Sequence, residues 1–183
     1  MRLMGWTILI LCISFFQVQA QKISFSEKRN SSLTYVKGND FEGVVFSKDF
    51  VFPFQSNESG DKRFTPTIVE IEAAEQLLLK EIKTVNAVQK NQGGDCGPVI
   101  HDNLKQFARQ YFGYYTPSGE KVVFISCLLK ANYMSLSKEV PNWLKGAVYV
   151  LNGGSNYWQV QANLNRSTLF GLDVNGLDRS ASR

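Results

Sequence analysis

The sequence KGAVYVLNGGSNYWQVQANLNRSTLFGLDV, residues 145–174, decides the fold that we expect for this chain. At its centre, Asn152-Gly153-Gly154-Ser155-Asn156 concentrates residues that form turns, and the flanking segments are rich in β-branched and aromatic residues. This combination is typical of a β-hairpin. The stretch therefore predicts three short antiparallel strands joined by two turns, with residues 148–150 in the first strand.

Strand periodicity divides the side chains of this stretch between two faces, because successive residues of a strand point in opposite directions. The set predicted to face a helix is Trp158, Val160, Phe170 and Leu172, with Leu169 on the other side. The set predicted to face away is Tyr149, Tyr157, Gln159 and Gln161. A tyrosine ring with its polar tip suits contact with peptides or glycans, so this second set is a candidate binding surface. The alternative is an ordinary cross-strand pair, or a face that the N-terminal segment covers.

Residues 65–83 form the clearest predicted helix. Thr67 and Glu70 have the spacing of a capping box, and a helix that begins at Pro66 after Thr65 is the alternative start. Apolar residues that recur at helical spacing are Ile68, Ile71, Ala74, Leu78 and Ile82. The charged residues between them, Glu75 included, are expected on a solvated face.

A second, shorter helix is predicted over residues 98–110, with an inward face made of Ile100, Leu104, Phe107, Ala108 and Tyr111. Residues 120–129 are expected to form a strand that is apolar on both faces. Together these elements predict an α+β fold: one long helix and a shorter one packed on an antiparallel β-meander of about four to five strands, with an N-terminal extended arm.

The first 20 residues have the pattern of a signal peptide, since Arg2 precedes a short apolar run and small residues precede a cleavage point after Ala20. Cys12 within this run raises the alternative of a lipoprotein. The sequence thus predicts an exported protein, periplasmic or extracellular. Residues 21–63 are the predicted arm or edge strands, 64–176 the α+β domain and 177–183 a flexible tail.

Within the arm, Phe50, Phe52 and Phe54 alternate, so their rings share one face. Pro53 favours an edge strand or an extended segment, because proline cannot donate a backbone hydrogen bond. We expect these rings to pack on the main domain rather than to bind a partner.

Two cysteines follow the leader, Cys96 and Cys127. In an exported protein this pair is a disulfide candidate, and the alternative is two separate buried thiols. The sequence around Cys96, with His101 nearby, resembles the surroundings of the nucleophile in papain-like proteases over a few residues only. The histidine of that family lies far downstream of its cysteine. A small cysteine-dependent hydrolase that uses Cys96 and His101 is therefore an alternative function.

The composition argues against several other functions. The formal net charge is +4 and the basic residues are scattered, so the electrostatic footprint of a nucleic-acid-binding protein is missing. The chain has a single histidine, and no residues at metal-ligand spacing surround it, so we expect no metal site. The sequence also lacks the motif of a phosphate-binding loop, so we expect no cofactor. After the leader, no apolar run reaches the roughly 20 residues of a transmembrane helix.

Three pieces of sequence together resemble a group of small exported proteins of Bacteroidetes-type bacteria that has no assigned function. They are Thr65-Pro66-Thr67, Arg109-Gln110-Tyr111-Phe112-Gly113-Tyr114 running into Gly119-Glu120-Lys121, and Gly153-Gly154-Ser155-Asn156-Tyr157-Trp158 before Val174-Asn175-Gly176. The resemblance implies a bacterial, extracytoplasmic setting. A helix followed by a meander is also similar to cystatin-type and PepSY-type domains, so a cystatin-like protease inhibitor is a further alternative. The leading prediction is a non-enzymatic binding or envelope-associated protein whose partner is a protein, peptide or glycan.

Overall fold

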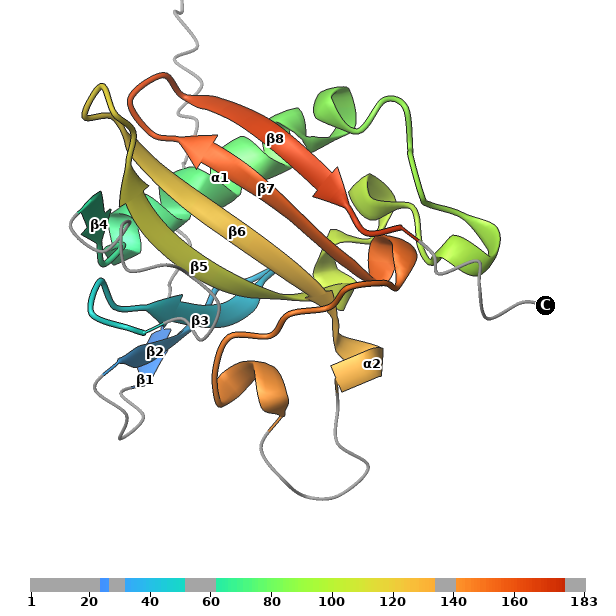
Figure 1. Cartoon of the computed structure of the whole chain (residues 1–183), viewed down its shortest axis with the longest axis horizontal. Coiled ribbons are helices and arrows are strands. Elements are labelled where there is room, and N and C mark those ends of the chain that lie inside the picture. The colour runs from blue at the N-terminus through green and yellow to red at the C-terminus, as the bar shows by residue number, and fades with distance from the viewer. Residues whose placement is uncertain (1–23, 27–31, 52–61, 134–140, 177–183) are drawn as a thin grey trace, which may run out of the picture.

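The computed structural model describes residues 24–26, 32–51, 62–133 and 141–176 (Figure 1). Its helices are α1 (Ile68–Val85) and the one-turn α2 (Lys130–Tyr133). The strands are β1 (Ser24–Ser26), β2 (Leu33–Lys37), β3 (Glu42–Phe46), β4 (Arg63–Phe64), β5 (Phe107–Tyr115), β6 (Lys121–Leu129), β7 (Tyr157–Asn163) and β8 (Thr168–Val174). The predicted α+β class is confirmed. The predicted leader and tail, and Phe52 and Phe54 of the arm, lie outside the described residues.

All eight strands of the described chain belong to one sheet, in the order β1-β2-β3-β5-β6-β7-β8, with β4 beside β5. Its pairs are antiparallel except β3 and β5, where Gly43 lies opposite Arg109 in a parallel register. β4 pairs with the second half of β5, so β3 and β4 share one edge of that strand. The sheet is larger than the predicted meander because β1, β2 and β3 come from the N-terminal segment.

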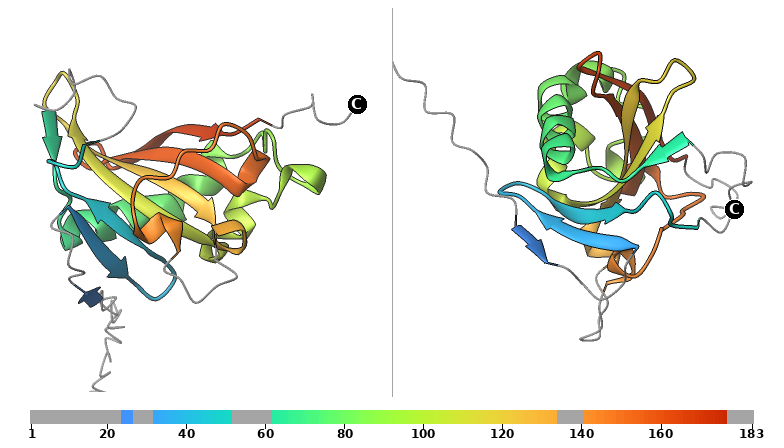
Figure 2. Two further views of the ribbon diagram at one scale, coloured as in Figure 1. Left: turned by 60° about the horizontal axis from the view of Figure 1, so that its bottom comes forward. Right: turned by 90° about the vertical axis from the view of Figure 1, so that its left-hand side faces the viewer.

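Helix α1 covers one face of this sheet (Figures 1 and 2). The predicted capping box is confirmed: the Thr67 backbone N–H donates to Glu70 Oε2 over 2.8 Å, and the Glu70 N–H donates to Thr67 Oγ1 over 3.4 Å. The helix-side core contains Ile71, Ala74, Leu78, Ile82, Trp158, Val160 and Ala162. Within the described residues, neither helix combines the length and the apolar character that crossing a membrane requires.

The predicted helix over residues 98–110 is wrong. Two short 3-10 turns, Ile100–Asp102 and Leu104–Gln106, lead into β5, which begins at Phe107. The whole of β5 pairs with β6, from Phe107 opposite Leu129 to Tyr115 opposite Lys121. This long hairpin outweighs the local helical spacing, because a strand is stabilised by its cross-strand neighbours.

The predicted strand at residues 148–150 is also wrong, since the described chain forms no strand between β6 and β7. The turn residues instead form the 3-10 turn Gly154–Asn156, and the N–H groups of Gly153 and Gly154 donate to the Gly176 carbonyl over 3.1 and 3.3 Å. Gly154 has a φ of +57°, and a Cβ there would lie 2.1 Å from the Cys96 carbonyl oxygen. Only glycine fits this close approach.

A β-bulge in β8 makes the predicted orientation of one side chain, Phe170, wrong. Gln161 lies opposite Phe170 and Gln159 opposite Asp173, so β8 holds an extra residue between these two pairs. Gly171 sits in this interval with a φ of +62°, a backbone conformation that favours glycine. As a result Leu172 packs against the helix-side core as predicted, whereas Phe170 is exposed and Leu169 takes the buried position.

Candidate functional site

The face of the sheet opposite α1, here called the outer face, carries an aromatic row next to a polar row. The strand register places Phe112, Phe124 and Gln161 side by side on β5, β6 and β7. The neighbouring polar row consists of Gln110, Ser126 and Gln159. Alternation along three well-paired strands therefore brings rings and hydrogen-bonding groups together on one surface.

Packing from β3 fixes the aromatic row. The Phe112 ring stacks on Phe46, with 4.5 Å between the ring centroids, and meets Phe124 edge-on at 5.9 Å. Phe46 in turn contacts the Phe50 ring at 4.6 Å. Phe50, the first of the three alternating phenylalanines, also packs against the outer-face cluster that contains Ala108 and Leu128, so this ring contacts the main domain as predicted.

Residues 143–150, here called the covering segment, cross the outer face (Figure 2). The fully buried side chain of Gln110 holds them. Its Nε2 donates to the Trp143 carbonyl over 3.0 Å and to the Gly146 carbonyl over 2.8 Å, and its Oε1 accepts from the Val148 N–H over 3.0 Å. One amide thus satisfies three backbone groups of a segment that has no strand partner.

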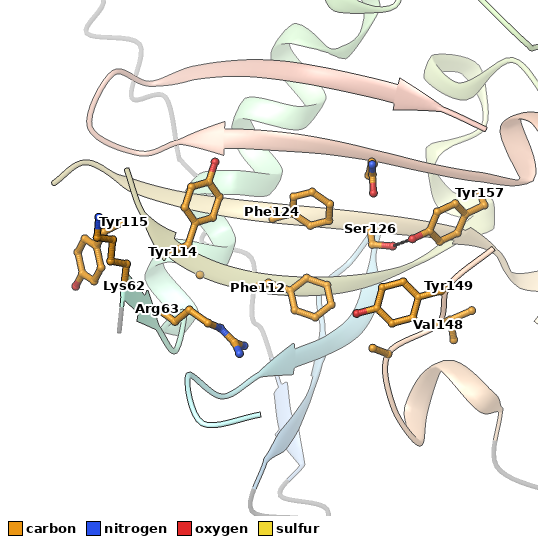
Figure 3. A pocket seen from close by; sticks show the side chains of 13 residues that line it. Lys62, Arg63, Phe112, Tyr114, Tyr115, Phe124, Ser126, Val148, Tyr149 and Tyr157 are labelled. Carbon is orange, nitrogen blue, oxygen red and sulfur yellow. Dashed lines mark hydrogen bonds between the residues drawn. The ribbon is translucent and has the colours of Figure 1, made fainter. Parts of the chain in front are cut away.

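A pocket of about 590 Å³ lies between the covering segment and the sheet. Its lining comprises Lys62, Arg63, Phe112, Gly113, Tyr114, Tyr115, Phe124, Ser126, Ala147, Val148, Tyr149, Tyr157 and Gln159. Figure 3 shows Phe112 and Phe124 in the middle, with Tyr149 and Tyr157 at one end and Lys62 and Tyr115 at the other. This volume, and an aromatic lining with a few convergent polar groups, are typical of small-molecule sites.

The two ends of the pocket differ in charge. At one end the Ser126 hydroxyl donates to the Tyr157 hydroxyl over 3.2 Å, and Gln159 Nε2 donates to Asp173 over 3.0 Å. Toward the other end are the cations Lys62 and Arg63, and the Arg63 guanidinium points to the middle of the pocket (Figure 3). Among the described residues, the lining includes no carboxylate, and Asp173, which is hydrogen-bonded to Gln159, is not part of it.

The Arg63 guanidinium is fixed in place by the backbone. Nη1 donates to the Phe50 carbonyl over 2.7 Å and Nη2 to the Ser47 carbonyl over 3.1 Å. Burial lowers the pKa of Arg63, and the Asp49 carboxylate opposes that effect. Arginine stays charged at neutral pH in spite of such a shift, so this end of the pocket is positive.

Three phenols of the lining are held in their neutral form. Burial raises the pKa of Tyr114 and of Tyr149, and it raises the pKa of Tyr157 although the hydrogen bond with Ser126 opposes it. Because a tyrosine pKa is already near 10, these hydroxyls remain protonated at neutral pH. Tyr114 donates its proton to Gln161, which leaves Tyr149 and Tyr157 as donors that a ligand can use.

The structure brings the four predicted binding residues to the outer face. Tyr149, Tyr157 and Gln159 line the pocket, and Gln161 lies beside it, hydrogen-bonded to the Tyr114 hydroxyl. Tyr157 faces away from α1 as predicted, but it is only 7% exposed because the covering segment packs over it. The predicted binding residues therefore gather at a partly covered pocket, whereas the sequence suggested an open face.

The predicted cysteine pair is not joined: Cys96 and Cys127 are both free thiols in the structure. Cys127 lies in β6 within the helix-side core, where burial raises the pKa of its thiol to about 12. Cys96 lies in the turn Gly94–Cys96, where its carbonyl accepts a hydrogen bond from Ser155. The His101 ring contacts Asn86 at 2.9 Å through Nδ1 and Asp102 at 3.7 Å through Nε2.

One predicted surface charge is buried. Glu75 is 3% exposed on α1, where its Oε1 accepts hydrogen bonds from Arg109 Nε over 3.3 Å and from the Tyr111 hydroxyl over 2.9 Å. Burial, followed by the charge of Glu75, raises the pKa of Tyr111 well above its ordinary value. The prediction that the charged residues of this helix lie on a solvated face is therefore wrong for Glu75.

Several pocket residues are not among the binding residues that the sequence predicts. They are Lys62, Arg63, Phe112, Tyr114, Phe124 and Ser126. The available signal was the aromatic content of FARQYFGYY, residues 107–115, because aromatic residues are enriched in strands. Lys62 and Arg63 gave no such signal, because β4 is two residues long.

Neither a protein-family model, nor a curated protein, nor a solved structure matches the chain. Among the described residues, no three His, Cys, Asp or Glu side chains gather in a way that could hold a metal ion. The pocket is therefore the feature of the described chain from which a function can be inferred.

Proposed function

We propose that the protein is an exported, non-enzymatic binding domain that takes its ligand into the outer-face pocket. The observation that carries the proposal is the pocket: about 590 Å³ between aromatic rings, with polar groups of Ser126, Tyr157 and Gln159 at one end. Rings fixed by packing offer apolar contact at a low entropic cost, which favours binding. Export and membership of the small exported Bacteroidetes-type group remain part of this proposal, supported by the sequence patterns alone.

The pocket supports binding better than hydrolysis. A nucleophilic cysteine needs a base within hydrogen-bonding reach and an electropositive setting. The His101 ring is hydrogen-bonded to Asn86, and neither Cys96 nor His101 lines the pocket. Binding therefore gives the outer-face pocket a role, whereas a cysteine hydrolase leaves it without one.

The test is a ligand-observed NMR screen of a fragment library against the wild type and two variants. Ala147→Trp places an indole on the pocket wall, and we expect it to abolish binding of the fragments that the wild type retains. Leu151→Trp is the matched control, because Leu151 is 92% exposed and outside the lining. Equal binding by all three proteins, or no binding by any of them, would reject the proposal.

A further inference from the structure

We infer that the pocket binds an organic anion that has a ring-containing apolar body, with the negative group at the Lys62 and Arg63 end. This inference rests on the proposed binding function and names the class of ligand. It follows from three properties of the lining: the rings in the middle, the sign of the charge at one end, and the neutral donors at the other.

The middle of the pocket selects a flat apolar body. Phe112 and Phe124 form its floor, and Tyr149 and Val148 of the covering segment form the opposite wall (Figure 3). Aromatic rings on two sides favour a planar ring between them through stacking or edge contacts. A glycan requires many hydrogen-bonding side chains for its hydroxyls, and the middle of this pocket offers almost none.

The charges along the pocket orient an anion. Lys62 and Arg63 lie toward one end, and Asp173 is hydrogen-bonded to Gln159 near the other (Figure 3). Within the described chain, Asp49 is the carboxylate whose charge acts on Arg63, and it pairs with Lys48 at 2.8 Å, which balances part of its charge. The field along the pocket therefore draws a negative group toward Lys62 and Arg63 and away from Asp173.

Arg63 and Lys62 contribute in different ways. Arg63 is anchored by the Phe50 and Ser47 carbonyls, so its guanidinium is a preorganised positive wall. Lys62 is exposed, with a flexible stem that can follow the anionic group of the ligand. An exposed ion pair with Lys62 is weak, and a charge-assisted hydrogen bond with the partly buried Arg63 is stronger. We expect the two residues together to favour an anion over a neutral ligand of the same shape by about tenfold.

The test measures dissociation constants by calorimetry for three probes with one ring system: naphthoate, the neutral naphthamide and naphthylmethylammonium. We expect naphthoate to bind about tenfold more tightly than naphthamide and the cation to bind most weakly. Lys62→Gln should reduce the preference for naphthoate about threefold. Lys83→Gln, an identical charge change at an exposed position of α1, should leave that preference unchanged.

The outcomes separate this inference from the function on which it rests. If naphthamide or the cation binds as tightly as naphthoate, the anionic class is wrong while pocket binding stands. If no naphthyl probe binds but fragments are lost in Ala147→Trp, the ligand class is again wrong and the pocket is still a binding site. If neither probes nor fragments bind, both proposals fail.

Discussion

The two faces of the sheet both bury polar side chains, but they use them differently. On the helix face, Glu75 accepts hydrogen bonds from Arg109 Nε and the Tyr111 hydroxyl, and the remaining guanidinium nitrogens of Arg109 donate to the backbone carbonyls of Leu104 and Phe107. On the outer face, Gln110 directs its whole amide to the backbone of the covering segment. Neighbouring residues of one strand, Arg109 and Gln110, thus stabilise two different structures: the sheet against its helix, and the segment that forms a wall of the pocket.

The largest expected effect tests the closed cluster of the helix face. Arg109→Met leaves the Glu75 carboxylate buried without a counter-charge, so we expect the free energy of unfolding to fall by about 3–5 kcal/mol in urea titrations. The double variant Glu75→Leu with Arg109→Met removes both charges and should recover most of that loss. If the double variant is no more stable than the single one, Glu75 and Arg109 do not act as mutual counter-charges.

The next effect tests the anchor of the outer face. Gln110→Leu removes three hydrogen bonds to the covering segment and leaves the Trp143 and Gly146 carbonyls and the Val148 N–H unpaired. We expect a loss of about 2–3 kcal/mol in unfolding free energy, together with faster amide hydrogen exchange in residues 143–150. Gln106→Leu, in an exposed position shortly before β5, is the control that should change neither. Unchanged exchange in Gln110→Leu would show that the segment is held by other contacts.

The smallest effect concerns a single proton in the helix-side core. Burial raises the pKa of the Cys127 thiol from 9.0 to about 12, so between these values the unfolded chain releases a proton that the folded protein keeps. Stability is therefore complete below about pH 9 and falls as the pH rises toward 12, by at most about 1.4 kcal/mol per pH unit. Unfolding measured across this range should show a shallower alkaline loss in Cys127→Ala. Identical slopes in the two proteins would mean that Cys127 does not titrate differently in the two states.

The sequence predicted correctly those features of the structure that depend only on residues close together in the chain. The capping box of Thr67 and Glu70 needs only neighbours in the chain, so the beginning of α1 could be predicted. The alternation from Tyr157 to Gln161 placed the candidate binding residues on the correct face, because period-two spacing follows from strand geometry alone. The signal for the bulge was also present, since an isolated glycine in a strand often marks one.

The strands that could not be predicted form by pairing with segments that are far away in the sequence. Residues 98–110 have helical spacing, and only the pairing of Phe107 and Ala108 with β6 makes their end a strand. The parallel pairing of β3 with β5 joins segments separated by the whole of β4 and α1, for which no local pattern exists. The pocket could not be predicted for the same reason: its residues are far apart in the sequence. Arg63 of β4 meets Phe112 of β5 and Tyr149 of the covering segment only after the sheet has assembled.

The bulge at Gly171 also affects how the protein meets other copies of itself. β8 is the last strand on its side of the sheet in the described chain, so its outer backbone groups have no strand beside them. A long, flat edge of this kind is a template for aggregation through strand pairing. The extra residue at Gly171 bends and twists that edge, and Asp173 adds a charge close by, so both features oppose intermolecular pairing. The same glycine that turns Phe170 outward therefore helps to keep the protein from self-associating through β8.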